Sequence, residues 1–331
     1  MAVRTPDFKA GPEEKETGMT LLDAIRISTK PAGGIAELGL PPRAPLLADW
    51  FKEGDTGFLF APRGLGKTWL SMGLACAVAN GSALGPWHAH KARKVVYVDG
   101  EMAVDGMLDR LAGMGSGENL SILNHEVLFH LGGKTLNVAD ADTQRALTGY
   151  VLESGAALIV LDNLSCLCSG QEENNADAWE PILHWLLILR RHKVAVLIVH
   201  HAGRNGQMRG TSRREDAAFW VLRLDAAEDA EGIAGRRATF LSRFTKERNS
   251  GKEQAPLQWT FETGTDGIVR VGHKEASGLS VFRQWIEDGL DTASDIATEM
   301  GVSKGTISKM AKRAQDAGWL TTAGRRYKLV S

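Results

Sequence analysis

The chain has 331 residues and a formal net charge of −1, so it has room for one large α/β domain and a small one, and it lacks an overall basic field that would attract nucleic acid. Its three cysteines, Cys76, Cys166 and Cys168, show no paired spacing, which excludes a disulfide framework and indicates a reducing, cytoplasmic setting. The sequence has no run of about 18 apolar residues, and its N-terminal segment lacks the apolar centre of a signal peptide, so neither a membrane span nor secretion is expected.

Composition divides the chain into four parts. Residues 1–44 are rich in proline, glycine and charge, and we expect an arm or linker there with one short helix over Thr20–Ile27. Residues 45–271 are expected to form the main domain and residues 272–279 a second linker. Residues 280–331 are expected to form a small separate domain.

Four short apolar runs predict buried strands in the main domain. They are Phe58–Phe60, Val95–Val98, Ala157–Leu161 and Val194–Val199. Continuous apolar runs separated by helical segments are typical of parallel strands that are covered on both faces. One intervening helix is indicated by an apolar face at helical spacing, formed by Trp179, Ile182, Leu183, Leu186 and Leu187. The fold class is therefore α/β, with a mainly parallel sheet flanked by helices.

The segment from Ala61 to Thr68, Ala-Pro-Arg-Gly-Leu-Gly-Lys-Thr, follows the first predicted strand and precedes a helix that begins at Trp69. Its glycines allow the backbone to curl so that successive N–H groups face phosphate oxygens at the positive end of the helix dipole. Lys67 can reach the β- and γ-phosphates, and the Thr68 hydroxyl can bind Mg²⁺.

The segment thus predicts a P-loop for ATP, or a related nucleoside triphosphate, together with Mg²⁺. The usual pattern begins with glycine, and we expect the small Ala61 to preserve the loop. The residues expected to contact the nucleotide are Arg63, Gly64, Leu65, Gly66, Lys67, Thr68 and Trp69.

Acidic residues end two of the predicted strands. Asp162 follows Ala157–Leu161, which is where a group that organises Mg²⁺ has to lie. The next residue, Asn163, cannot take a proton from water, so the general base has to come from another strand. Glu101, at the end of the strand after the P-loop helix, is the favoured base, with Asp99 as a weaker rival. The alternative is that Glu101 only caps the segment that follows it.

Two histidines end the strand Val194–Val199. A polar group at this point can sense the γ-phosphate and pass the signal to the next loop. His200 and His201 would point to opposite sides of the strand, so one of them is expected to serve, and His201 is favoured because it is nearer the carboxyl end. A purely structural role for both is the alternative.

Four shorter strands are expected after residue 215, as an antiparallel edge of the sheet: Phe219–Leu224, Ala238–Thr245, Leu257–Glu262 and Ile268–Val271. Strand alternation places Lys246 and Arg248 on one face at the end of the second of these strands. A planar guanidinium suits the charge of a transferring phosphoryl group. The alternative is a pair of solvated basic residues.

The last part of the chain has the pattern of a winged helix-turn-helix. Apolar side chains at 281–286, the segment Thr292–Met300 and the segment Ser303–Arg313 predict three helices, and Trp319–Leu329 predicts a two-stranded wing. Residues 303–328 carry seven basic side chains against one acid, Asp316. A basic third helix and wing on a neutral chain favours contact with DNA, although such domains also serve as protein docking modules.

The P-loop, Glu101, Asp162, the histidine pair and the Lys246-x-Arg248 pair together resemble the RepA-like branch of RecA/DnaB-type P-loop ATPases, the hexameric replicative helicases of plasmids and other mobile elements. The resemblance covers about residues 45–270, and the C-terminal winged helix is additional to it. It implies that Lys246 and Arg248 enter the ATP site of a neighbouring copy. It also implies that the arginine-rich loop at 203–214 faces a central channel, where Arg204 or Arg209 would grip single-stranded DNA.

The leading hypothesis from the sequence is an ATP-driven motor on single-stranded DNA, assembled as a homo-oligomeric ring, that acts in replication of a mobile element. In the second hypothesis, the chain is an ATP-switched regulator or loader that uses its winged helix without unwinding DNA. A recombinase-like filament former ranks last, because the N-terminal part has no obvious polymerisation strand.

Overall fold

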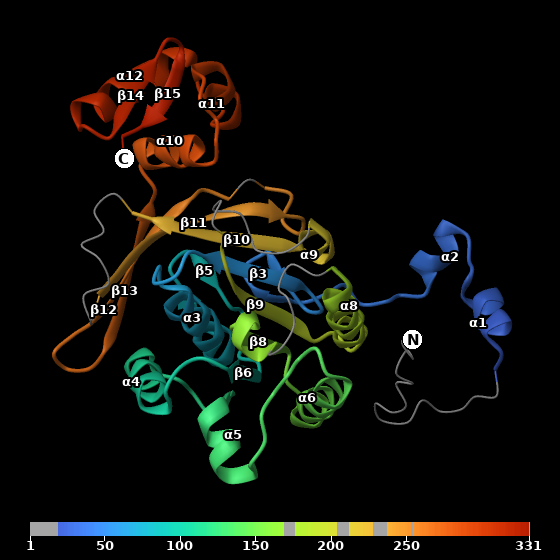
Figure 1. Cartoon of the computed structure of the whole chain (residues 1–331). Helices are drawn as coiled ribbons and strands as arrows, with labels where there is room; N and C mark the ends of the chain where they lie inside the picture. The colour runs from blue at the N-terminus through green and yellow to red at the C-terminus, as the bar shows by residue number, and fades with distance from the viewer. Residues whose placement is uncertain (1–18, 169–175, 204–211, 228–236, 253, 331) are drawn as a thin grey trace.

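The computed structural model describes residues 19–168, 176–203, 212–227, 237–252 and 254–330 (Figure 1). Within these residues, the central sheet has nine strands in the order β13-β12-β11-β10-β3-β9-β8-β6-β7. The fold is therefore the predicted α/β class, and the sheet places β9 between the strand before the P-loop segment and the strand that ends at Asp162.

The six parallel strands are β3 (Thr56–Ala61), β6 (Val95–Asp99), β7 (Leu120–Asn124), β8 (Leu158–Asp162), β9 (Ala195–His201) and β10 (Trp220–Ala226). Every residue of β3, β6, β8 and β9 is buried, which confirms the four apolar runs as central strands. The sequence did not predict β7, because its residues are only half-buried apart from Asn124.

The antiparallel edge consists of β11 (Arg237–Glu247), β12 (Leu257–Thr263) and β13 (Val269–Glu275). The expected edge is thus present, with one correction: β10, its first predicted strand, pairs parallel to β3. Two short hairpins, β1 (Pro45–Leu47) with β2 (Phe51–Lys52) and β4 (Ala83–Leu84) with β5 (Trp87–His88), stand outside the main sheet.

Helices cover both faces of the sheet (Figure 1). One face packs against α3 (Lys67–Asn80) and α4 (Val104–Met114), and the other against α6 (Ala141–Ser154) and α8 (Ala176–Arg191). Alternation along the strands divides the core in this way: Leu59 belongs to the first cluster, and Phe58 and Phe60 belong to the second. The shorter helices are α5 (His125–Gly132), α7 (Leu164–Leu167) and α9 (Ser212–Ala217).

The apolar face of α8 differs from the predicted one at a single position. Trp179, Ile182 and Leu186 are buried as expected, but the Leu187 side chain is 42% exposed. Trp185, which is fully buried, takes its place and donates its indole N–H to the Thr148 hydroxyl of α6 at 2.8 Å. The buried face of α8 therefore includes position 185 and leaves out position 187, because a helix turns about 100° per residue.

An aromatic cluster ties the late strands to the strand that precedes the P-loop segment. Trp50 contacts Trp87, Trp220 and Phe244, with ring centroids 4.9–5.1 Å apart. Gly57 in β3 leaves room for this cluster, since a Cβ atom there would lie 2.0 Å from the Trp220 ring. The packing holds β10 and β11 firmly beside β3.

The N-terminal arm contains two helices, α1 (Leu21–Ser28) and α2 (Ala32–Glu37). The first confirms the expected helix and is capped by the Thr20 hydroxyl, which accepts the N–H of Asp23. The second was not predicted, because it contains two glycines. Neither helix buries a side chain, and both stand apart from the sheet domain (Figure 1).

The C-terminal unit, residues 278–330, comprises α10 (Gly278–Glu287), α11 (Ala293–Glu299), α12 (Lys304–Asp316), β14 (Leu320–Ala323) and β15 (Arg326–Leu329). Its own core is built around Phe282, Ile296 and Ile307. The linker predicted at 272–279 requires correction: β13 continues to Glu275 and α10 begins at Gly278, because Leu257–Thr263 offers a paired edge over this whole length. Among the described helices, none has the length and apolarity needed to cross a membrane.

Candidate functional site

The P-loop segment connects β3 to α3 at the carboxyl edge of the sheet. Gly64 and Gly66 have φ values of +77° and +85°, in the left-handed region that glycine adopts most readily. A Cβ atom on Gly66 would also lie 2.6 Å from the Phe240 ring of β11. Glycine is therefore required at position 66 for two reasons: the backbone conformation of the loop and the close packing of β11 against it.

The Lys67 ammonium lies under this loop. It donates to the carbonyl oxygens of Ala61 at 3.1 Å and Pro62 at 2.9 Å, so it occupies the hollow that the loop encloses. Burial lowers the pKa of Lys67 to about 8, and the nearby carboxylates of Asp162 and Glu101 act in the opposite direction. A buried ammonium among backbone carbonyls is suited to a polyanionic ligand, which would favour its charged form.

Asp162 is buried at the end of β8. Its Oδ2 accepts the hydroxyl of Tyr97 at 2.6 Å and lies 3.5 Å from the Ser71 hydroxyl. Burial raises the pKa of Asp162 to about 6, while hydrogen bonds from Tyr97 and Thr68 lower it. The hard oxygen atoms of Asp162 and Thr68 fit a Mg²⁺ ion, whose charge would offset the cost of a buried carboxylate.

Asp99 and Glu101 have different surroundings at the end of β6. Asp99 is buried, and its Oδ1 accepts the backbone N–H groups of Glu101 and Met102, both at 3.1 Å. Its Oδ2 accepts the side-chain amide of Asn124 at 2.9 Å. Asp99 therefore fixes the backbone of Glu101 by hydrogen bonds, whereas the Glu101 side chain is exposed.

The ends of β8 and β9 meet Glu101 through Asn163. The Asn163 amide donates to Glu101 Oε2, and its nitrogen lies 3.3 Å from His201 Nε2. The structure thus brings Lys67, Thr68, Asp162, Glu101 and His201 together at one edge of the sheet. His200, its neighbour on β9, pairs in the sheet with Phe60 and is fully buried.

Lys246 and Arg248 lie elsewhere in the sheet. Lys246 pairs with Val221, which is level with Phe58, and the Arg248 N–H donates to Phe219 at the amino end of β10. Both are therefore displaced toward the amino edge, away from the P-loop of their own chain. The register of β11 against β10 shifts between Phe244 and Lys246, and the strand ends at Glu247, so the placement of Lys246 and Arg248 on one face stays a prediction.

The Lys246 ammonium donates to the Glu215 carbonyl, and burial lowers its pKa. The Trp69 ring packs at 6.1 Å from Phe261 and lies under the guanidinium of Arg110 at 4.7 Å. The contact of Trp69 with the nucleotide stays a prediction. Arg204 and Arg209 lie outside the described residues.

Sequence reasoning missed the polar residues that support this edge, namely Ser71, Tyr97, Asn124 and the amide contacts of Asn163. Tyr97 had a signal, since it is the polar member of an otherwise apolar run in β6. Asn124 ends a strand that was not recognised, and the contacts of Asn163 depend on strand order.

A family model described as an AAA domain matches residues 23–207, which is more than half of the chain. This range includes the P-loop segment, Glu101, Asp162 and His201, and it ends before β10. No match was found among curated proteins.

Two solved structures from archaea are similar to this chain. The KaiC-like protein PH0186 from the hyperthermophile Pyrococcus horikoshii OT3 has 19% identity and a TM-score of 0.47, and the match covers 69% of this chain and 99% of that one. The flagellar accessory protein FlaH from Methanocaldococcus jannaschii has 13% identity and a TM-score of 0.46, with 66% of this chain and 90% of that one covered.

Proposed function

The chain belongs to the AAA domain family of P-loop ATPases, and from this premise we propose that it is an ATP-hydrolysing motor on single-stranded DNA. The proposed form is a hexameric helicase of the RepA-like type that acts in replication of a plasmid or another mobile element. The observation that carries the ATPase part is the convergence of Lys67, Thr68, Asp162 and Glu101 at the carboxyl edge of one sheet.

In this proposal, the backbone N–H groups of residues 63–69 and the Lys67 ammonium bind the phosphates. Thr68 and Asp162 hold Mg²⁺, which supplies charge neutralisation at the phosphate oxygens when it is bound. Glu101 accepts a proton from the attacking water, since Asn163 has no basic oxygen for this task. Asp99 keeps the backbone of Glu101 in place through its two N–H bonds.

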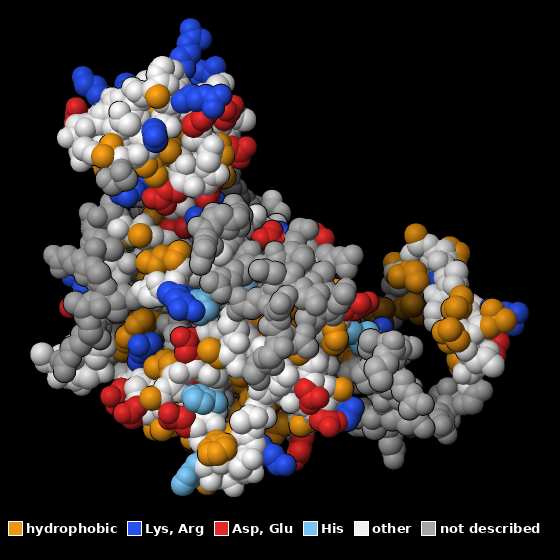
Figure 2. Space-filling view, in the orientation of Figure 1, with side chains coloured by type: hydrophobic (Ala, Val, Ile, Leu, Met, Phe, Trp, Pro, Cys, Tyr) orange, Lys and Arg blue, Asp and Glu red, His pale blue; other side chains and the backbone are white. Residues whose placement is uncertain are grey.

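The positions of Lys246 and Arg248 support a shared active site. Because both lie toward the amino edge of their own sheet, a role in catalysis requires that they act on the nucleotide of a neighbouring copy. The N-terminal arm supports self-association as well, because α1 and α2 bury none of their side chains in the monomer. Figure 2 shows apolar side chains gathered on these two helices.

The C-terminal unit supports a DNA partner. Its three helices and hairpin fit a winged helix, with α12 as the helix presented to duplex DNA. Figure 2 shows basic side chains at its outer end. The seven exposed basic residues of α12 and the hairpin are Lys304, Lys309, Lys312, Arg313, Arg325, Arg326 and Lys328.

Glu101→Gln tests the catalytic assignment. The variant is expected to retain ATP binding and to lose hydrolysis by about 10²–10⁴-fold, because the amide keeps the shape of the side chain but cannot accept the proton. ATP turnover and nucleotide affinity are measured side by side, with Glu126→Gln, at an exposed glutamate on α5, as the matched control. Normal turnover in Glu101→Gln would refute its role as the base.

The motor itself is tested with single-stranded DNA. Hydrolysis should be stimulated by single-stranded DNA, forked duplexes should be separated, and electron microscopy with ATP should show a closed ring. Absence of both stimulation and strand separation would sink the motor proposal while leaving the ATPase intact.

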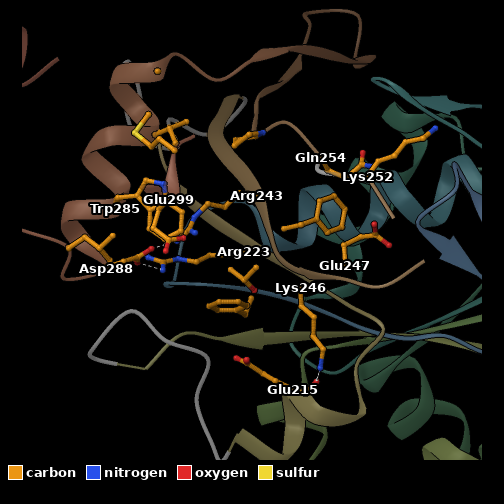
Figure 3. Close-up of a pocket in the computed structure, with 18 of the residues that line it drawn as sticks. Glu215, Arg223, Arg243, Lys246, Glu247, Lys252, Gln254, Trp285, Asp288 and Glu299 are labelled. Atoms are coloured by element: carbon orange, nitrogen blue, oxygen red, sulfur yellow. Dashed lines mark hydrogen bonds and ion pairs between the residues drawn. The ribbon is translucent and has the colours of Figure 1, made fainter. Parts of the chain in front are cut away.

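A second candidate is an ATP-switched DNA-binding regulator or loader. It is favoured by the direct ionic connection between the C-terminal unit and the sheet: Asp288 pairs with Arg223 of β10 and Arg243 of β11 (Figure 3). Arg223 is in register with Phe60, the residue before the P-loop segment. Site-specific duplex binding that requires residues 280–331, without unwinding, would support this candidate.

A further inference from the structure

Asn163 lies where three elements of the candidate site meet, and its amide orientation is determined by chemistry. It is fully buried and directly follows β8, and its Oδ1 accepts the backbone N–H of Cys166 at 3.0 Å as the cap of α7. A backbone N–H can only donate, so the atom bonded to it has to be the amide oxygen. The NH₂ group therefore faces the opposite way.

That NH₂ group faces Glu101 and His201. It donates one hydrogen to Glu101 Oε2, and the nitrogen lies 3.3 Å from His201 Nε2. Since the NH₂ group has only hydrogens to offer, His201 Nε2 has to be the acceptor. This contact requires a neutral imidazole that carries its proton on Nδ1.

We propose that Asn163 is a positioning residue for ATP hydrolysis, which holds the Glu101 carboxylate in its working orientation and uses His201 as a second anchor. The inference rests on the proposed role of Glu101 as the base. Asp99 holds only the backbone of Glu101, and a carboxylate at the end of an exposed side chain has several rotamers. A bond from a buried amide, itself held at two further points, selects one of them.

The simpler role of Asn163 is to cap α7. Asn163→Asp separates the two roles, because aspartate caps a helix as well as asparagine does. It can still accept the Cys166 N–H, but it has no hydrogen to donate and it repels the Glu101 carboxylate. Asn163→Ala loses both functions. Asn163→Ser keeps a capping hydroxyl, lacks the NH₂ group and adds no charge.

The test measures kcat for ATP and the dissociation constant for ADP without metal in these three variants. If Asn163 positions Glu101, all three should lose about 100-fold in kcat, with ADP affinity changed by less than about threefold. Asn163→Ser should keep the thermal stability of the parent, because it retains a capping hydroxyl and buries no charge. Should Asn163→Asp fail to fold, Asn163→Ser provides the same comparison.

A double-mutant cycle with Glu101→Gln shows whether the effect passes through Glu101. In the Glu101→Gln background, Asn163→Ser should reduce the residual turnover by less than about threefold, because the carboxylate that it positions is already gone. Parent-like kcat in both capping variants, or a full 100-fold loss in the Glu101→Gln background, would overturn the inference. Normal turnover of Glu101→Gln alone would instead refute the proposed base, which is a separate failure.

Discussion

Three polar residues at the carboxyl edge, Asp99, Asp162 and Asn163, are buried, and each is held by hydrogen bonds from other elements. A buried polar group without partners costs about 1–3 kcal/mol. Here each has a defined partner, such as Tyr97 for Asp162 and Asn124 for Asp99. The side chains in the site are thereby held in place before any ligand arrives, which is the arrangement that catalysis requires.

The pKa of the Cys76 thiol in α3, the helix that follows the P-loop, provides a test of how deeply this helix is buried. Burial raises the pKa of Cys76 to about 11, whereas the unfolded thiol has its ordinary value of 9.0. Above pH 9, the unfolded chain loses this proton more readily than the folded one. The free energy of unfolding should therefore fall as pH rises through this window, by about 2–3 kcal/mol in total.

The measurement is urea unfolding of the parent and of Cys76→Ala at pH 7.5 and pH 10.5. The other titrating groups cancel in the comparison, so the parent should lose about 2 kcal/mol more than the variant between these two values. An equal loss in both proteins would show that Cys76 is not the group responsible.

At the scale of secondary-structure elements, β10 and β11 carry the arginines that pair with the C-terminal unit and so join it to the sheet domain. Arg223 of β10 and Arg243 of β11 each pair with Asp225 and with Asp288, and the side chains of all four residues are at most 13% exposed. Figure 3 shows Asp288 of the C-terminal unit directed at both guanidinium groups, beside the Trp285 ring. Arg243 also lies over that ring, at 5.1 Å from its centroid. Arg223, Arg243 and Asp288 line a cleft of about 890 Å³ between the sheet and the C-terminal unit.

Asp288→Asn should release the C-terminal unit from the sheet. The substitution leaves two buried guanidinium groups with less compensating charge, and breaking such a pair costs about 3–5 kcal/mol. Limited proteolysis at residues 276–277 should become markedly faster. Asp316→Asn, an exposed change in the same unit, is the control. Equal cleavage rates for the two variants would show that Asp288 does not hold the unit.

For the molecule as a whole, the N-terminal arm is the feature that the monomer leaves unexplained. An isolated helix needs about 12–15 residues to be marginally stable in water, and α1 has 8. Leu21 and Leu40 are 77% and 72% exposed. The family match begins at residue 23, inside α1, so this helix is part of the matched domain. In the proposed oligomer, burial of the arm against a second copy would supply the stabilisation that the helix lacks.

The double change Leu22→Glu and Ile25→Glu should weaken self-association at least tenfold, because it places charge on the apolar side of α1. Light scattering after size-exclusion chromatography, with and without ATP, measures the assembly. Lys30→Glu, an exposed charge change on the same arm, is the control. If the doubly substituted protein assembles like the parent, the arm does not form the contact between copies.

Local patterns were enough to predict much of this protein. The P-loop segment, the four central strands and the three C-terminal helices are indicated by spacing, turn residues and capping within short stretches. Ser303, for example, the first residue of the third predicted helix, caps α12. The choice of Glu101 and Asp162 as site residues also came from their position at strand ends, and both lie at the same edge of the sheet.

Only the tertiary structure decided which side chains share that edge. The order of strands places β9 beside β8, which brings Asn163 within reach of His201. The antiparallel pairing of β11 with β10 places Lys246 and Arg248 toward the amino edge, away from the P-loop of their own chain. Strand order and register depend on contacts between residues far apart in sequence, and no local pattern encodes them. For that reason the P-loop could be predicted from the sequence, whereas the contacts of the Asn163 amide with Glu101 and His201 could not.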